Sequence, residues 1–350
     1  MTTMPPPPHL RRLEPRQGLK ALLSFGLVAL LIVFVLPRVT GAEWALVGDR
    51  IAQLSLTQWA LLIVLWLTGL YAHTFLTTAA LPGLHHGQAL ALNLSSSAVS
   101  NLFPFGGALG MGLSYAMIRS WGHGRGSFAP FAAITTLCNV LIKLALPVVA
   151  LGLLLGAGGL PTPGLAVGAL VGGVVLLVVV LVVAAALSSD RAARAVGGVA
   201  QLVVGRALRL VRSSRQVGIE SSIVDLRQRM SGLVRSRWRR MLLGTVVYAV
   251  LQASLLWTVL DMLGSELGAV PVFAGFAFGR LLTLLVVTPG GVGIVETGTA
   301  ALLVTLGGEA GVVAAGTLLF AAITFALEIP VGVVTGLLWW RRAGSAGVAA

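Results

Sequence analysis

Uncharged stretches long enough to cross a lipid bilayer recur along this chain and constrain its fold more than any other feature. The stretch 165–187 contains no charged residue, and the stretch 311–340 contains only Glu328. An α-helix needs about 20 apolar residues to cross the ~30 Å hydrocarbon core. Since 57% of the residues are hydrophobic and only 10% are charged, an ordinary soluble domain is excluded. The sequence therefore predicts an all-α integral membrane protein.

The distribution of basic residues predicts the orientation of the chain in the cell membrane. Arginine and lysine gather near the N-terminus, in the connection 188–239 and directly after Trp340. Cytoplasmic loops of membrane proteins carry such an excess, so both termini and the connection are expected in the cytoplasm. The segments 38–56, 263–270 and 307–310 lack this excess and are expected to face outward.

The net charge of +13 is thus explained by membrane orientation, and nucleic acid is not an expected partner. Within the connection, arginines recur every third residue among apolar residues, which predicts a helix lying on an anionic lipid surface. These arginines are Arg206, Arg209, Arg212 and Arg215.

The apolar stretches predict about six full spans and two re-entrant helical hairpins. The full spans are expected near 20–37, 57–81, 127–155, 164–187, 240–262 and 311–340. Two further stretches, 88–118 and 271–306, must begin and end on the same side of the membrane. They are broken at 101–107 and 288–293, where proline and glycine stop helices. The arms of the first stretch, of roughly 16 and 11 residues, are only about 24 and 17 Å long as helix. Neither arm is long enough to span.

The two hairpins are expected to enter from opposite sides, which makes the halves 57–155 and 240–340 an inverted repeat. One offset of 185 residues relates Pro104 to Pro289 and also Lys143 to Glu328. Broken helices at the midplane of an inverted repeat indicate the binding site of a transporter.

Ionisable residues at membrane depth are the candidates for this binding site. A charge in hydrocarbon costs roughly 2.5–3.5 kcal/mol or more, so such residues are expected to face the bundle interior. Lys143 or Arg280 is expected to meet an anionic phosphate, with Glu296 and Glu328 as counter-ions or proton carriers. The alternatives are a structural ion pair between Lys143 and Glu328, and a capping role for Glu296, which lies three residues after Gly293. The predicted substrate-binding residues are Pro104, Gly106, Gly107, Lys143, Arg280, Pro289, Gly290, Gly291, Gly293, Glu296 and Glu328.

Two motifs resemble those of a known family. The sequence TPGGVGIVETG at 288–298 and the sequence PFGG at 104–107 are similar to the lysylphosphatidylglycerol synthase transmembrane region, also called the flippase-like domain family. The resemblance covers about 20–342 and implies a lipid flippase fold. It does not imply aminoacyl-transferase activity, which in this family resides in a separate soluble domain. Ala108 and Ser114 stand where many members carry other residues, so the resemblance does not specify a lysyl-lipid headgroup.

The expected function is a flippase or transporter that moves a phospholipid or a polyprenyl-linked anionic lipid by alternating access. The alternatives are a membrane-embedded transferase of lipid-linked groups and a scaffold that holds a cytoplasmic enzyme. No cofactor or metal is expected, since His85 and His86 lack helical ligand spacing and Cys138 is the single cysteine. The protein partner is expected to be either a second copy of the chain or a cytoplasmic enzyme. The tails are predicted at 1–19 and 343–350, on either side of a membrane domain at 20–342.

Overall fold

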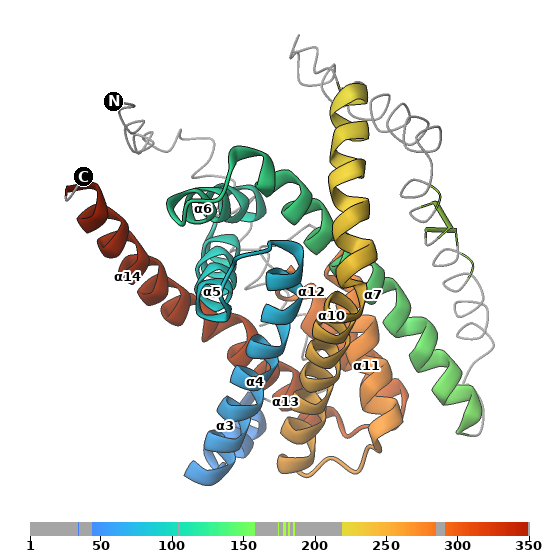
Figure 1. The fold of residues 1–350 in the computed structure, drawn as a ribbon. Helices are drawn as coiled ribbons and strands as arrows, with labels where there is room; N and C mark the ends of the chain where they lie inside the picture. Colours follow the sequence, from blue (N-terminus) through green and yellow to red (C-terminus); the bar gives the residue numbers. More distant parts are fainter. Residues whose placement is uncertain are drawn as a thin grey trace.

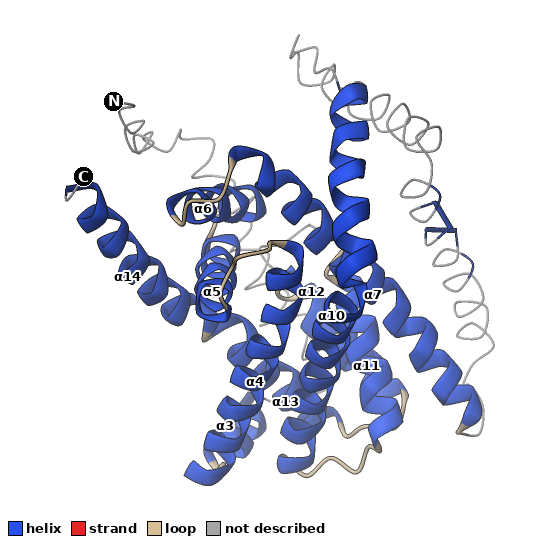
Figure 2. Ribbon diagram, in the orientation of Figure 1, coloured by secondary structure: helices blue, strands red, loops and turns tan. Residues whose placement is uncertain are grey.

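The computed structural model describes residues 44–103, 106–157, 219–284 and 291–348, together with isolated helical positions at Phe34 and between 174 and 185. Every regular element in these ranges is a helix (Figure 2), which confirms the all-α prediction. The predicted spans 20–37 and 164–187 lie outside the described ranges, as do the tail 1–19 and the proposed lipid-surface helix at 206–215.

Four of the predicted spans are confirmed as helices that are long and apolar enough to cross a membrane. Their long, nearly uncharged sequences favour helix, because a helix satisfies its backbone hydrogen bonds within the segment. The first begins at a capping box formed by Ser55 and Gln58. The four candidate spans are Leu56–Ala80, Arg125–Gly156, Leu226–Met262 and Ala310–Ala343.

The helices that contain these spans are connected by shorter ones (Figure 1). The order of the described α-helices is α3 (Trp44–Ala52), α4 (Leu56–Ala80), α5 (His86–Leu102), α6 (Gly106–Ser120), α7 (Phe128–Gly156), α10 (Ile219–Met262), α11 (Ala269–Leu282), α12 (Ile294–Thr305), α13 (Ala310–Ala321) and α14 (Glu328–Val348).

The two predicted breaks separate two pairs of short helices. We call α5 and α6 the first broken pair, and α11 and α12 the second broken pair. Gly106 allows α6 to turn back on α5, because a Cβ at this position would collide with the backbone of Ser100. Gly293 precedes α12 with a φ of 87°, a conformation that favours glycine. The first break is therefore observed where the sequence predicts it. In the second pair, α12 begins directly after the predicted break, but α11 ends at Leu282, before that break, and 285–290 lie outside the described residues. Re-entry into the membrane stays a prediction.

The last candidate span differs from a uniform α-helix. A π-helical segment, Ala322–Ala326, separates α13 from α14 and places Glu328 at the first position of α14. Single π-helical turns are rare and are frequent at functional sites. Nothing in the apolar sequence of 311–340 predicts this interruption.

The core is built where α10 packs along α4 and where α13 packs against α10. Leu255, Leu256, Val259 and Leu260 of α10 are almost completely buried there. On the other side of the molecule, α14 crosses α5 closely. Both broken pairs are thus held against long helices.

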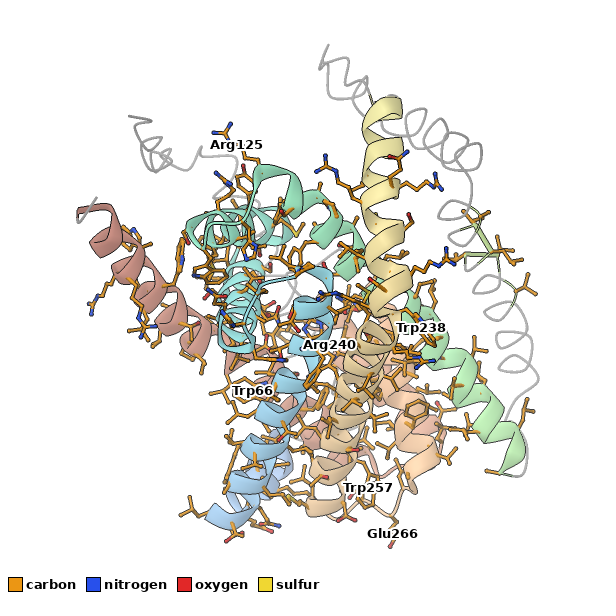
Figure 3. The ribbon with its side chains drawn as sticks, viewed as in Figure 1. Trp66, Arg125, Trp238, Arg240, Trp257 and Glu266 are labelled. Carbon is orange, nitrogen blue, oxygen red and sulfur yellow. The ribbon has the colours of Figure 1, made fainter. Side chains whose placement is uncertain are left out.

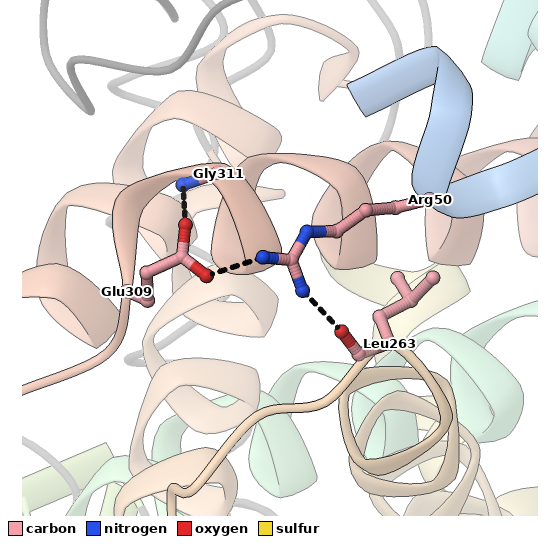
Figure 4. A network of polar contacts seen from close by, with 4 residues as sticks. All are labelled: Arg50, Leu263, Glu309 and Gly311. Carbon is pink, nitrogen blue, oxygen red and sulfur yellow. Dashed lines mark hydrogen bonds and ion pairs between the residues drawn. The ribbon is translucent and has the colours of Figure 1, made fainter. Parts of the chain in front are cut away.

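A polar contact joins three of the segments that the sequence predicts to face outward (Figure 4). The Arg50 guanidinium lies 2.9 Å from a carboxylate oxygen of Glu309 and donates a second hydrogen bond of 2.8 Å to the Leu263 carbonyl. The other Glu309 oxygen accepts a hydrogen bond from the Gly311 amide and caps α13. Because the pair is exposed, its net contribution is small, about 0–1 kcal/mol. The contact gathers the three segments at one end of the bundle.

The crossing of α5 and α14 yields a test of the packing. A Cβ at Gly332 would collide with the Leu94 carbonyl and the Ala98 side chain, whereas a Cβ at Gly112 would meet no atom within 4 Å. Gly332→Ala is therefore expected to destabilise the protein by about 1–3 kcal/mol, the usual range for overpacking. Thermal unfolding in detergent measures the effect, with Gly112→Ala as the matched control. Equal stability of the two variants would contradict this close crossing.

Candidate functional site

A cavity of about 520 Å³ lies between the two broken pairs and is completed by α7, α10 and the π-helical interruption. Six of the predicted substrate-binding residues line it, although they come from widely separated parts of the sequence. These are Gly107, Lys143, Arg280, Gly291, Glu296 and Glu328. The helix breaks and the deeply placed charges therefore meet at one site.

The other predicted residues lie elsewhere or outside the described ranges. Gly106 and Gly293 flank the two breaks and shape them, but they do not line the cavity. Pro104, Pro289 and Gly290 are outside the described residues. The contribution of these five positions to substrate binding stays a prediction.

Arg280 contacts the cavity through a guanidinium that lies on two aromatic rings. The carbon Cζ is 5.3 Å from the centroid of Phe276 and 5.9 Å from that of Tyr248. Such cation–π contacts contribute about 0.5–2 kcal/mol, and more when they are desolvated. No carboxylate or other acceptor among the described residues takes a hydrogen bond from this guanidinium. Its five donors are therefore available to a ligand.

Lys143 brings a second cation to the cavity from α7. Among the described residues, no ion pair joins it to Glu328. The Glu328 carboxylate, which is only 7% exposed, instead accepts a hydrogen bond from the Ser97 hydroxyl of α5. The structure thus lacks the Lys143–Glu328 pair that was one alternative for these residues.

Glu296 has a structural contact that agrees with the other alternative. Its carboxylate accepts a hydrogen bond from the Gly293 amide and caps the first turn of α12. The residue is 6% exposed and also lines the cavity. Capping therefore accounts for at least one of its carboxylate oxygens.

Sequence reasoning missed two residues of α10 at this site. Tyr248 and Gln252 line the cavity, and the Gln252 amide donates a 3.0 Å hydrogen bond to the Tyr248 hydroxyl. Gln252 is 2% exposed, and its Oε1 has no hydrogen-bond partner among the described residues. A glutamine inside an apolar span is a signal that could have been used, because polar side chains in spans face the bundle interior.

The two ends of the bundle differ in charge, as the basic residues predict. Figure 3 shows Arg125 at the end where α6 leads into α7, and Glu266 at the opposite end. Arg240 and Trp238 lie on α10 between these two ends. A cavity between two ends of different charge suits a protein of fixed orientation in its membrane.

The family comparison identifies the kind of membrane protein. The family described as lysylphosphatidylglycerol synthase TM region matches residues 21–332. The chain belongs to this family. The match includes both broken pairs and every described residue that lines the cavity, and it confirms the resemblance noted at 104–107 and 288–298. Among curated proteins, no sequence matches the chain. Family membership supports a multi-pass membrane protein with a role in lipid modification or lipid flipping.

Two substitutions of Glu296 test whether it stabilises the protein by capping α12 or by its negative charge. Glu296→Ala removes the acceptor for the Gly293 amide and is expected to lower stability by about 1 kcal/mol, as loss of a helix cap does. Glu296→Gln keeps an acceptor at the same position and is expected to preserve stability. Thermal unfolding of both variants checks this expectation. A Gln variant as unstable as the Ala variant would show that the charge itself holds the break.

Proposed function

We propose that this protein is a flippase that moves an anionic lipid, either a phospholipid or a polyprenyl-linked lipid, across the cell membrane. The observation that carries the proposal is the Arg280 guanidinium, which lines a cavity between two broken helix pairs and has no acceptor among the described residues. Arg280 is half-buried, and its planar fork of donors matches the geometry of a phosphate, which it can bind in a bidentate manner.

Lys143 of α7, a helix that packs against α11, supports the same proposal as a second cation that lines the cavity. Two cations on separate helices are able to hold one phosphate from two sides, the arginine in a bidentate manner and the lysine as a point charge. The nearby carboxylates are engaged elsewhere, Glu328 with Ser97 and Glu296 with Gly293. They therefore leave the cations available for the substrate and can serve as counter-ions once the phosphate has left.

The arrangement of the broken pairs suits alternating access. Helix ends at membrane depth are tolerated only where protein or water covers them, and here both sets of ends face the cavity. In the proposed cycle each broken pair closes the cavity from its own side, so that the headgroup crosses while the acyl or prenyl chains stay in the lipid. The basic connection 188–239 would hold the cytoplasmic side against anionic lipid.

A scrambling assay in proteoliposomes tests the proposal. Fluorescent lipids with different headgroups are reconstituted with wild type, Arg280→Gln, Lys143→Gln or the control Arg239→Gln, and dithionite measures the fraction that has changed leaflet. Arg239 is a suitable control because it lies outside the cavity, over the ring of Trp238. We expect both cavity substitutions to slow the flipping of anionic lipids about tenfold or more, since a hydrogen bond to a charged group contributes about 1.5–3 kcal/mol.

Two results would overturn this function. Flipping that is equally fast for anionic and zwitterionic lipids, and unaffected by either cavity substitution, would show that the cations do not select the substrate. The absence of flipping for every lipid, including polyprenyl-linked phosphates, would instead favour a scaffold or a transferase.

A further inference from the structure

We propose that Tyr248 is a positioning residue that couples the two broken pairs, so that an anion bound at Arg280 in the second pair changes the position of the first pair. This inference rests on the proposed function for the identity of the ligand. It assigns a role to a set of contacts that the binding of phosphate does not by itself require.

The contacts begin at the cavity, where the Tyr248 ring lies beneath the Arg280 guanidinium at 5.9 Å. The ring is held at its far end by the hydrogen bond from the Gln252 amide to its hydroxyl. It also fits beside Gly69 of α4, where an added Cβ would lie 3.8 Å from the ring. Tyr248 is therefore fixed by both long helices, α4 and α10, while it faces the cation.

The contacts continue on α4, where the His73 ring packs against Tyr248 with centroids 4.9 Å apart. The Nδ1 atom of His73 lies 3.0 Å from the Asn93 amide nitrogen. An amide nitrogen only donates, so Nδ1 accepts this bond and the neutral ring carries its proton on Nε2. Asn93 belongs to α5, the first arm of the first broken pair.

One continuous set of contacts therefore runs from the second broken pair to the first: Arg280 on α11, Tyr248 on α10, His73 on α4 and Asn93 on α5. Close-packed interiors transmit displacement because they contain little free volume. When a phosphate draws the guanidinium away from the two rings, Tyr248 loses a partner on one face and shifts against His73. The hydrogen bond to Asn93 then passes this shift to α5.

A purely structural role for Tyr248 makes a different prediction. If the ring only fills the interface between α4 and α10, its removal lowers stability but does not alter the response of α5 to a ligand. If Tyr248 couples the two pairs, removal of the Asn93 side chain abolishes the response of α5 although the anion still binds.

The experiment places a fluorescent reporter at the start of α5. Cys138→Ser removes the single cysteine, and Gly87→Cys supplies a labelling site where an added Cβ meets no atom within 4 Å. The full-length labelled protein is titrated with phosphatidylglycerol in nanodiscs of phosphatidylcholine, and the emission of the reporter is recorded. Lipid binding is followed separately in each variant by the thermal shift of the protein.

The variants are Tyr248→Phe, Tyr248→Leu, Asn93→Ala, Arg280→Gln and the control Ser96→Ala. The Ser96 hydroxyl bonds only to the backbone of its own helix. We expect wild type, Tyr248→Phe and Ser96→Ala to show the lipid-dependent change in emission. We expect Asn93→Ala to bind the lipid but to lose the change, or to require about fivefold more lipid for it, as typical coupling energies imply. Tyr248→Leu should also lose it. Tyr248→Phe keeps the ring and is its matched control, and the thermal shift of Tyr248→Leu with lipid shows whether that variant is folded and binds.

The outcomes distinguish this inference from the proposed function. A response that persists in Asn93→Ala, or in Arg280→Gln, would overturn the coupling even if flipping is observed. A wild-type protein whose reporter does not respond to the anionic lipid would overturn it as well. A response that depends on Tyr248 and Asn93, in a protein that flips no lipid, would support the coupling and overturn transport alone.

Discussion

Backbone hydrogen bonding is the constraint on which the rest of this structure depends. Inside hydrocarbon every amide and carbonyl needs a partner within the protein, so long apolar segments become helices and interruptions must be covered. Two of the interruptions here are stabilised by local means, a close turn at Gly106 and a capped positive-φ glycine at Gly293. Both breaks face the same cavity. The residues that cover the helix ends therefore also form the wall of the cavity.

The charged side chains of the cavity differ in the contacts that stabilise their charges. The two carboxylates obtain hydrogen bonds from the protein itself, one from the Ser97 hydroxyl and one from the Gly293 amide. The guanidinium of Arg280 lies on the faces of two rings, and among the described residues Glu328 acts on it through its charge without a hydrogen bond or an ion pair. Ring quadrupoles attract a cation without occupying its donors. A site built in this way keeps guanidinium donors available for the proposed anion, although it contains as many carboxylates as cations.

The sequence alone predicts much of the fold and a part of the site. Segment length and composition are sufficient for α4, α7 and the part of α10 at 240–262, but the sequence reading assigned 219–239 to a connection, whereas α10 already begins at Ile219. Proline and glycine indicate the breaks at 101–107 and 288–293. The participation of Tyr248 was not predicted, because the part of α10 that follows Arg240 is largely apolar on all sides and its periodicity does not show which face turns inward. Gln252, a polar side chain in this span, carried a signal that the sequence reading did not use. The relation between Lys143 and Glu328 was also uncertain, since an offset along the chain does not place two side chains within contact distance.

The length of α10 has a mechanical consequence. Its 44 residues form a rod about 66 Å long, more than twice the ~30 Å thickness of the hydrocarbon. Figure 1 shows its N-terminal part extending well past the rest of the bundle. If α10 tilts as one rigid helix, a tilt of roughly 5° moves its protruding end by about 3 Å over a ~30 Å arm. A force that tilts the protruding part of α10 is therefore transmitted along one continuous helix to the residues of α10 that line the cavity.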